Sequence, residues 1–315
     1  YINSKNAYFQ TDIIGNLAES GNWFINLKED FNTLDTIQKK SENCIVVSAD
    51  LYQNSGATIT QQLAYSLAHA NEYLNQFGGI VAKKIHFSFS VGSNYFFEIA
   101  KLRAFGMLWS ALLEEYKISN LNAHLFVQPS HRNKTLYDYN VNLLRTTTEC
   151  MSAILGGAHT ISNISYDTIY QKSNEFGERI ARNQLLILQQ ESALSKAQNI
   201  ADGSYYIESI THQLAENALV LFKQIEKSGG FLKQLKTGTI QKKINNSATK
   251  EEKETPLLGT NFQLNNNDRM QQNIKLYPFV KKRNIKTLIT PLTRKRISEP
   301  LEKERLLSEK TNQSN

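Results

Sequence analysis

The sequence feature that most constrains the fold is a strand pattern followed at once by a helix pattern. Residues 85–91 (IHFSFSV) alternate strictly, so that His86, Ser88 and Ser90 share one face and four apolar residues share the other. Residues 94–109 (NYFFEIAKLRAFGMLW) then carry apolar side chains at helical spacing. This pair predicts a buried strand that leads directly into a long helix packed against its sheet.

The alternation of strand and helix continues along the chain. The helix over 94–109 is expected to begin at Asn94, whose side chain can cap the first turn, with Glu98 near its positive end. Strands are also expected at 44–49, 123–128 and, more weakly, 159–165, and helices at 61–77, 139–155, 175–192 and between 202 and 229. Such an order is typical of α/β proteins, in which helices cover a parallel sheet.

A doubly wound sheet and a barrel both fit this order. No glycine-rich phosphate loop follows any expected strand, which removes the main support for a nucleotide-binding doubly wound sheet. The small hydrophilic face of His86, Ser88 and Ser90 favours a barrel with something threaded through it, because most barrels fill this face with bulky branched residues. An edge strand with one wet face is the alternative.

The charge divides the chain into regions. Residues 231–315 hold 18 Lys and Arg against 8 Asp and Glu, whereas residues 1–230 hold 18 against 21. We expect a polar lead-in over 1–40 with a short apolar piece near Trp23, a barrel portion over 41–230, and a basic extension or linker over 231–315 whose ordered structure dissolves after Phe231. Its short apolar and basic segments are expected to dock on something larger.

Several chemistries lack sequence support. The six histidines show no HxxxH pairing, and Cys44 and Cys150 lie in apolar runs typical of buried free thiols in a reducing compartment, so no metal site is expected. The G-x-S-x-G motif of serine hydrolases is absent. No apolar run reaches the roughly 18 residues that a membrane span needs, and nothing before Cys44 is typical of a signal peptide. We therefore expect a cytoplasmic protein without membrane contact.

Residues 94–109 also resemble the signature helix FFxEIAKxRAxxxLW of the methylmalonyl-CoA mutase family. Five further stretches resemble family motifs in the same order: SADLYQNSGAT (48–58), VQPSHRNKT (127–135), SAILGGAHTISNISYD (152–167), NEFGERIARNQLLILQQES (174–192) and ADGSYYIESIT (201–211). The resemblance implies a (β/α)8 TIM-type barrel of which the first strands are missing. It also implies radical chemistry with adenosylcobalamin, which is held by a separate domain, on a coenzyme A thioester inside the barrel.

The chain departs from the family pattern at pocket positions. The family has a histidine two residues before the glutamine of its QTSG motif, where it can hydrogen-bond the substrate carbonyl; here that position is Phe126. Gln128, Ser130 and Glu175 keep the family residue. Other pocket positions have changed, namely Asp50, Leu51, Pro129, His131, Ser162 and Ile164. The resemblance therefore assigns no catalytic residue to this chain.

The cobalt-ligand motif D-x-H-x-x-G is also absent, and no cobalamin-binding domain is expected here. The chain most resembles the small (beta) subunit of heterodimeric bacterial mutases, which implies a catalytic large subunit as partner and adenosylcobalamin bound by that partner, with none on this chain. An active acyl-CoA mutase with a rebuilt pocket and, with less support, a nucleic-acid-binding barrel that uses the basic tail stay open as alternatives. Whether an acyl-CoA still enters the barrel also stays open. Four scaffold residues are expected to serve buried ion pairing and packing, Glu98, Arg103, Arg145 and Arg179.

Overall fold

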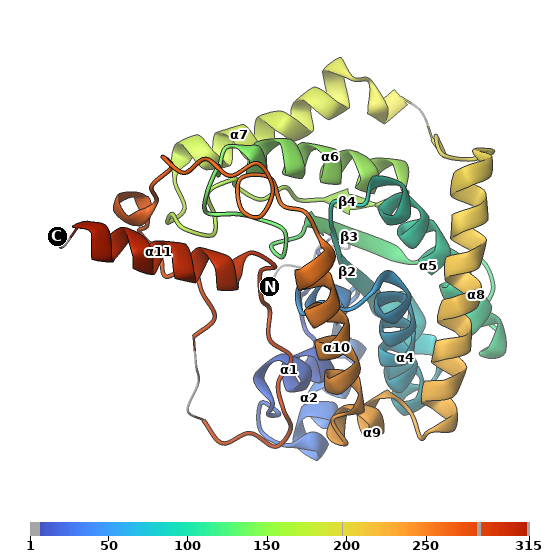
Figure 1. Cartoon of the computed structure of the whole chain (residues 1–315). Helices are drawn as coiled ribbons and strands as arrows, with labels where there is room; N and C mark the ends of the chain where they lie inside the picture. The colour runs from blue at the N-terminus through green and yellow to red at the C-terminus, as the bar shows by residue number, and fades with distance from the viewer. Residues whose placement is uncertain (1–6, 197, 282–284, 314–315) are drawn as a thin grey trace.

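The computed structural model describes residues 7–196, 198–281 and 285–313, and it is built around a parallel sheet (Figure 1). Four strands lie in the order β1-β2-β3-β4. Their bounds are β1 Ile45–Ser48, β2 Ile85–Val91, β3 His124–Pro129 and β4 Thr160–Ile161. The predicted α/β architecture with a parallel sheet is confirmed. Closure of a (β/α)8 barrel stays a prediction, because four strands form the sheet among the described residues.

Helices cover the sheet in two layers. Between the strands lie α3 (Ala49–Asn54), α4 (Ile59–Phe77), α5 (Tyr95–Glu115), α6 (Val141–Leu155) and a 3-10 segment at Gly79–Lys84. After β4 come α7 (Glu175–Leu186), a π-helical turn at Ile187–Glu191, a 3-10 turn at Leu194–Lys196 and α8 (Tyr205–Lys227). Helix α8 packs outside α4 and α5, so its stripe of Ile207, Ile210, Leu214 and Ala218 is buried (Figure 1).

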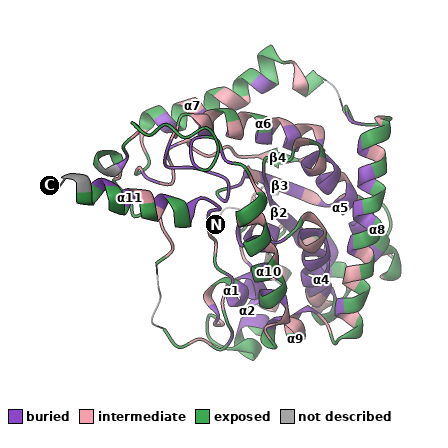
Figure 2. Cartoon of the chain, viewed as in Figure 1, coloured by how far each residue is buried: buried purple, intermediate pink, exposed green. Residues whose placement is uncertain are grey.

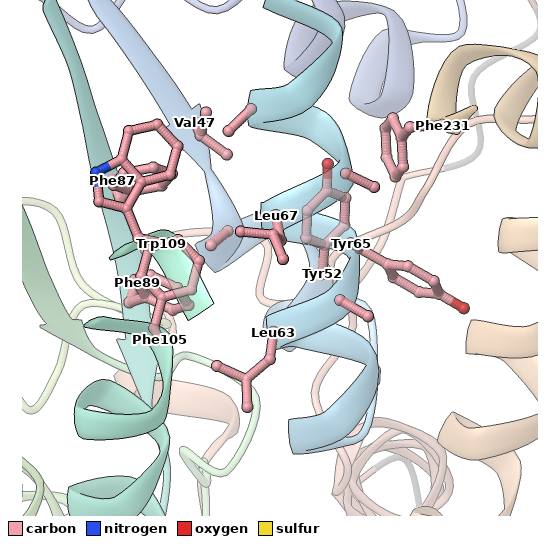
Figure 3. Close-up of a cluster of buried hydrophobic side chains, with 14 of the residues drawn as sticks. Val47, Tyr52, Leu63, Tyr65, Leu67, Phe87, Phe89, Phe105, Trp109 and Phe231 are labelled. Atoms are coloured by element: carbon pink, nitrogen blue, oxygen red, sulfur yellow. The ribbon is translucent and has the colours of Figure 1, made fainter. Parts of the chain in front are cut away.

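The main core lies between the sheet and α4 and α5. The ring of Phe87 meets Phe105 at 4.5 Å and Trp109 at 4.9 Å between centroids, and Phe89 meets Phe105 at 4.9 Å (Figure 3). Tyr52 joins the cluster from α3, with its ring edge-on to that of Phe231. These edge-to-face contacts add to the burial of large apolar surface.

Strand β2 is buried on both faces, which excludes the alternative of an edge strand with one wet face. Its neighbours β1 and β3 pair with it on either side, and Figure 2 shows the strands buried beneath the helices. The free edge of β1 runs beside the lead-in, since Phe9 N donates to Asn43 O and Val46 N donates to Thr11 O, both at 3.0 Å.

The lead-in expected over 1–40 is largely helical in its described part. Two helices form there, α1 (Ile13–Ser20) and α2 (Leu27–Lys40), and they bury Ile14 and Phe31 in the main core. In the short apolar piece near Trp23, the side chain of Phe24 is exposed. Residues 1–6 of the lead-in lie outside the described residues.

The prediction that ordered structure dissolves after Phe231 is also wrong. Phe231 begins α9 (Phe231–Lys236), which is followed by α10 (Thr239–Glu254), a 3-10 turn at Gln271–Asn273 and α11 (Glu299–Gln313). Helix α10 lies within the part of the chain that we expected to be a linker. Few of its side chains are buried, and Ile240, Ile244 and Ala248 among them recur at steps of four. This narrow apolar stripe lies in a segment that is otherwise rich in Asn, Lys and Glu, so the composition alone does not indicate a helix.

Some local features agree with the sequence-based expectations and others differ. The positive φ expected of helix ends is found at Gly157 after α6 and at Gly229 and Gly230 after α8. The strand expected over 159–165 shrinks to β4. Asn94 stands at the N-cap of α5 but makes no side-chain capping bond. Cys44 and Cys150 are free and buried, as expected, and burial raises the pKa of the Cys150 thiol to about 12.

Candidate functional site

The inner face of the sheet, turned away from α4 and α5, is where the sequence placed the pocket. In the parallel register Ser88 pairs with Phe126, and Phe126 pairs with Thr160 of β4. One step along, Ser90 pairs with Gln128. Phe126 is half-buried in the middle of this face and carries no hydrogen-bond donor. The middle of the inner face therefore carries an aromatic ring that cannot donate a hydrogen bond.

The polar side chains around Phe126 are used to hold the chain together. Asn54 Nδ2 donates to Ser90 Oγ at 3.0 Å, and Ser130 Oγ donates to Gln53 Oε1 at 2.8 Å. Ser130 Oγ also accepts from the backbone N–H of Arg132 at 2.9 Å. These bonds tie the end of α3 to β2 and to the loop after β3. Two hydroxyls that could face a substrate are thereby committed to internal contacts.

An imidazole pair lies on the same inner face beneath the lead-in. The ring of Tyr8 stacks on His124 with 4.1 Å between centroids and meets His86 edge-on at 5.3 Å. His86 is 1% exposed, and neither of its ring nitrogens has a hydrogen-bond partner among the described residues. Burial, and then the neighbouring His124, lower the pKa of His86 to about 4. At neutral pH His86 is therefore an uncharged, packed ring.

The remaining pocket residues do not converge on one point. Gln128 is half-buried on β3, whereas Glu175 is exposed in the first turn of α7. Within the described parts of the chain, no hydrogen bond or ion pair links Glu175 to Phe126, Gln128 or Ser130. The described residues also contain no group of three or more His, Cys, Asp or Glu side chains that could hold a metal ion.

The four scaffold residues divide evenly. Glu98 forms a buried ion pair with Lys101, and Arg103 pairs with Asp202 and Glu208 between α5 and α8, as expected in kind. Arg145 instead donates hydrogen bonds to Thr135, Asn142 and the carbonyl of Leu258. Arg179 is exposed and lies over the ring of Phe176. These two arginines therefore serve hydrogen bonding and packing, and no ion pair is found for either among the described residues.

A cavity of about 420 Å³ lies at the carboxyl ends of β1 and β2, where ligands bind in open α/β sheets. Its walls include Gln53, Gly92, Glu98 and Arg132, and α10 contributes Glu251. Arg132 Nε donates to Glu251 Oε2 at 2.6 Å, so the extension is attached by an ion pair at the mouth of the cavity. Nothing in the sequence indicated that Arg132 and Glu251 pair, since 119 residues separate them.

The parallel sheet, its helical cover and the small polar side chains of its inner face define an α/β domain. The chain belongs to the methylmalonyl-CoA mutase family, whose model matches residues 3–305.

Relatives extend this assignment. The chain is 40% identical over 230 residues to the methylmalonyl-CoA mutase small subunit of Porphyromonas gingivalis, a match that covers 68% of this chain and 37% of that protein. It is 36% identical over 223 residues to the methylmalonyl-CoA mutase of Rhizobium meliloti, covering 67% of this chain and 31% of that one.

The large subunit of Porphyromonas gingivalis matches at 32% over 219 residues, covering 66% of this chain and 30% of that protein. The relatives thus include a small and a large subunit from one organism. The chain spans about a third of the length of the curated relatives it matches. None of the helices in the described residues is long and apolar enough to cross a membrane.

Proposed function

We propose that this chain is the barrel portion of a small, non-catalytic subunit of an adenosylcobalamin-dependent methylmalonyl-CoA mutase. The large subunit would carry out the isomerisation of methylmalonyl-CoA to succinyl-CoA, and this chain would stabilise it through a heterodimer interface in the cytoplasm. The observation that carries the proposal is Phe126, which presents a ring to the inner face at the position of the family's histidine. The similarity to a small subunit supports the same assignment.

The residues of this chain do not fit adenosylcobalamin. The cobalt-ligand motif is absent from the 315 residues, and the inner-face histidines His86 and His124 are packed against Tyr8. The cofactor would therefore be bound by the large subunit. The commitment of Ser90 and Ser130 to Asn54 and Gln53 further supports a structural role, because an acyl-CoA would have to break these bonds to use the hydroxyls.

The experiment is to purify the chain alone and together with a mutase large subunit, and to measure adenosylcobalamin binding and methylmalonyl-CoA turnover in each sample. We expect both activities only when the large subunit is present, and we expect this chain to raise the thermal stability of that subunit. Turnover by the isolated chain would overturn the proposal.

Substitution at the central position sharpens the experiment. Phe126→His restores a donor on the inner face, yet we expect it to produce no turnover in the isolated chain, because Ser90 and Ser130 stay engaged. Phe96→His, at an exposed position of α5, is the matched control for the added imidazole. Activity gained with Phe126→His and not with Phe96→His would favour an acyl-CoA mutase with a rebuilt pocket.

A further inference from the structure

A second cavity, of about 240 Å³, lies between the loop after β3 and the C-terminal segment that precedes α11. We call it the basic cavity, because its walls carry His131 and four arginine or lysine side chains against one carboxylate, Glu299. Thr168 and the aromatic residues Tyr277 and Phe279 complete the wall that the argument uses. The four cationic residues are Arg132, Arg294, Lys295 and Arg296.

The charges of the basic cavity are largely balanced by acids outside its wall. Arg132 pairs with Glu251, Lys295 with Glu252, and Arg296 with Glu302, while Arg294 pairs with both Glu19 and Asp50. A ligand would therefore be held by directed hydrogen bonds and by the local potential, since little net charge is left over.

Arg296 has an unused donor. The residue is 6% exposed, and its Nη1 and Nη2 donate to Glu302, Ser298 and the carbonyls of Lys134 and Pro278. Its Nε has no hydrogen-bond partner among the described residues. Leaving a buried donor unsatisfied costs on the order of 1–3 kcal/mol, more when the group is charged, so an orphan N–H on a cavity wall indicates an acceptor that the protein itself does not supply.

Arg294 presents a second guanidinium to the same space. It is partly exposed, and its Nε and Nη1 donate to Glu19 at 2.7 Å and to Asp50 at 2.6 Å. Among the described residues no partner is recorded for Nη2. Arg294 and Arg296 are thus anchored by acids, and each keeps one nitrogen donor without an acceptor among the described residues.

The protonation of His131 depends on the electrostatic potential inside the basic cavity. It is accessible to solvent, yet surrounding protein and the cations Lys134, Arg294 and Arg296 hold the pKa of its ring to about 4. The ring is neutral at pH 7 and can donate one further hydrogen bond. The family motif has a glycine at this position, so the side chain is an addition in this chain. An anion in the cavity would favour the protonated ring.

We propose that the basic cavity binds a phosphate group, which accepts hydrogen bonds from Arg296 Nε, from Arg294 and from His131. A tetrahedral oxyanion with several acceptor oxygens suits converging guanidinium donors. The rings of Tyr277 and Phe279 meet edge-on, with 5.6 Å between centroids, and offer an apolar surface for the organic part of a phosphate monoester. Inorganic phosphate and a monoester share the chemistry, and the experiment distinguishes them.

The test titrates the full chain, labelled in its histidine side chains, with inorganic phosphate, ribose 5-phosphate and AMP at constant ionic strength, with sodium chloride as control. We expect saturable binding with each phosphate compound and a rise in the pKa of His131 that chloride does not produce. Tighter binding of AMP than of inorganic phosphate assigns a monoester, and equal binding assigns free phosphate. Absence of saturable binding, or the same response to chloride, overturns the proposal.

Two matched variants locate the site. Arg296→Lys keeps the charge and the pairing with Glu302 but loses Nε, so the affinity for phosphate should fall by about tenfold, the equivalent of one charge-assisted hydrogen bond. Arg182→Lys, at an exposed position of α7, should bind as the unaltered chain does. If Arg296→Lys unfolds, Arg294→Lys provides the same comparison. Unchanged binding in a folded Arg296→Lys protein contradicts the assignment.

Discussion

The sheet region and the α11 end of the C-terminal extension are held in place by different forces. Between the sheet and α4 and α5 the contacts are apolar and aromatic, with Phe87 and Trp109 at their centre (Figure 3). Helix α11 is instead fixed to the loop after β3 mainly by polar bonds, beside an apolar contact of Leu306. Glu302 accepts from Leu136 N at 2.8 Å and pairs with Arg296, and Glu309 accepts from Tyr137 Oη at 2.6 Å. Apolar side chains that pack on a core recur at regular spacing along a helix or strand, so they can be recognised in the sequence. Isolated polar bonds leave no such periodic pattern, so the attachment of α11 could not be predicted.

The largest effect is expected in the apolar region. Trp109→Ala removes a side chain that is 1% exposed and packed on Phe87, so it should lower the free energy of unfolding by about 4 kcal/mol through lost burial and an unfilled cavity. Urea unfolding measures the change. Phe96→Ala, on the same helix but 48% exposed, should cost less than about 1 kcal/mol. Equal costs for the two variants would contradict the core described above.

The next effect distinguishes the extension from the sheet. Glu302→Gln leaves the guanidinium of Arg296 buried without its counter-charge, which should cost about 3 kcal/mol. Hydrogen exchange should speed up in α11 and around Leu136 before it changes in β2. Glu304→Gln, at an exposed position of the same helix, is the control. Replacing both partners, as Arg296→Met with Glu302→Leu, should recover part of the loss. Faster exchange in β2 with α11 unchanged would mean that the extension is not a separate polar attachment.

A third prediction concerns acid stability and the inner face. The pKa of His86 is lowered to about 4 in the folded chain, so below its ordinary value of about 6.5 the unfolded chain takes up the proton first. Stability is therefore complete above about pH 6.5 and falls as the pH drops toward 4, by a total of the order of 3 kcal/mol. His86→Leu should remove this part of the pH dependence in urea titrations at several pH values. An unchanged slope would show that other groups, such as His131, account for the acid sensitivity.

The sequence predicted the fold where apolar residues repeat. Strand β2, helix α5 and helix α8 with its terminal glycines were predictable because each carries a stripe of local period. Helix α1 was not, because it is only eight residues long, and helix α10 was not, because its few buried apolar residues lie among many polar ones. Phe126 could be named only through the resemblance, and its role on the inner face stays a prediction. The bonds from Asn54 to Ser90 and from Ser130 to Gln53 join residues 36 and 77 positions apart, for which a single sequence carries no signal.

The smallest effect tests whether burial determines how much an ion pair contributes to the free energy of unfolding. Arg103 lies between α5 and α8 with Asp202 and Glu208, and its side chain is 20% exposed against 7% for Arg296. Glu208→Gln should cost less than about 1 kcal/mol, because Arg103 keeps Asp202 and water screens the pair. High salt should erase this cost and leave that of Glu302→Gln nearly unchanged, since screening acts on exposed charges. Equal losses in the free energy of unfolding for the two substitutions would mean that the attachment of α11 does not depend on the burial of its ion pair. The apolar contact of Leu306 would then be the main attachment of α11.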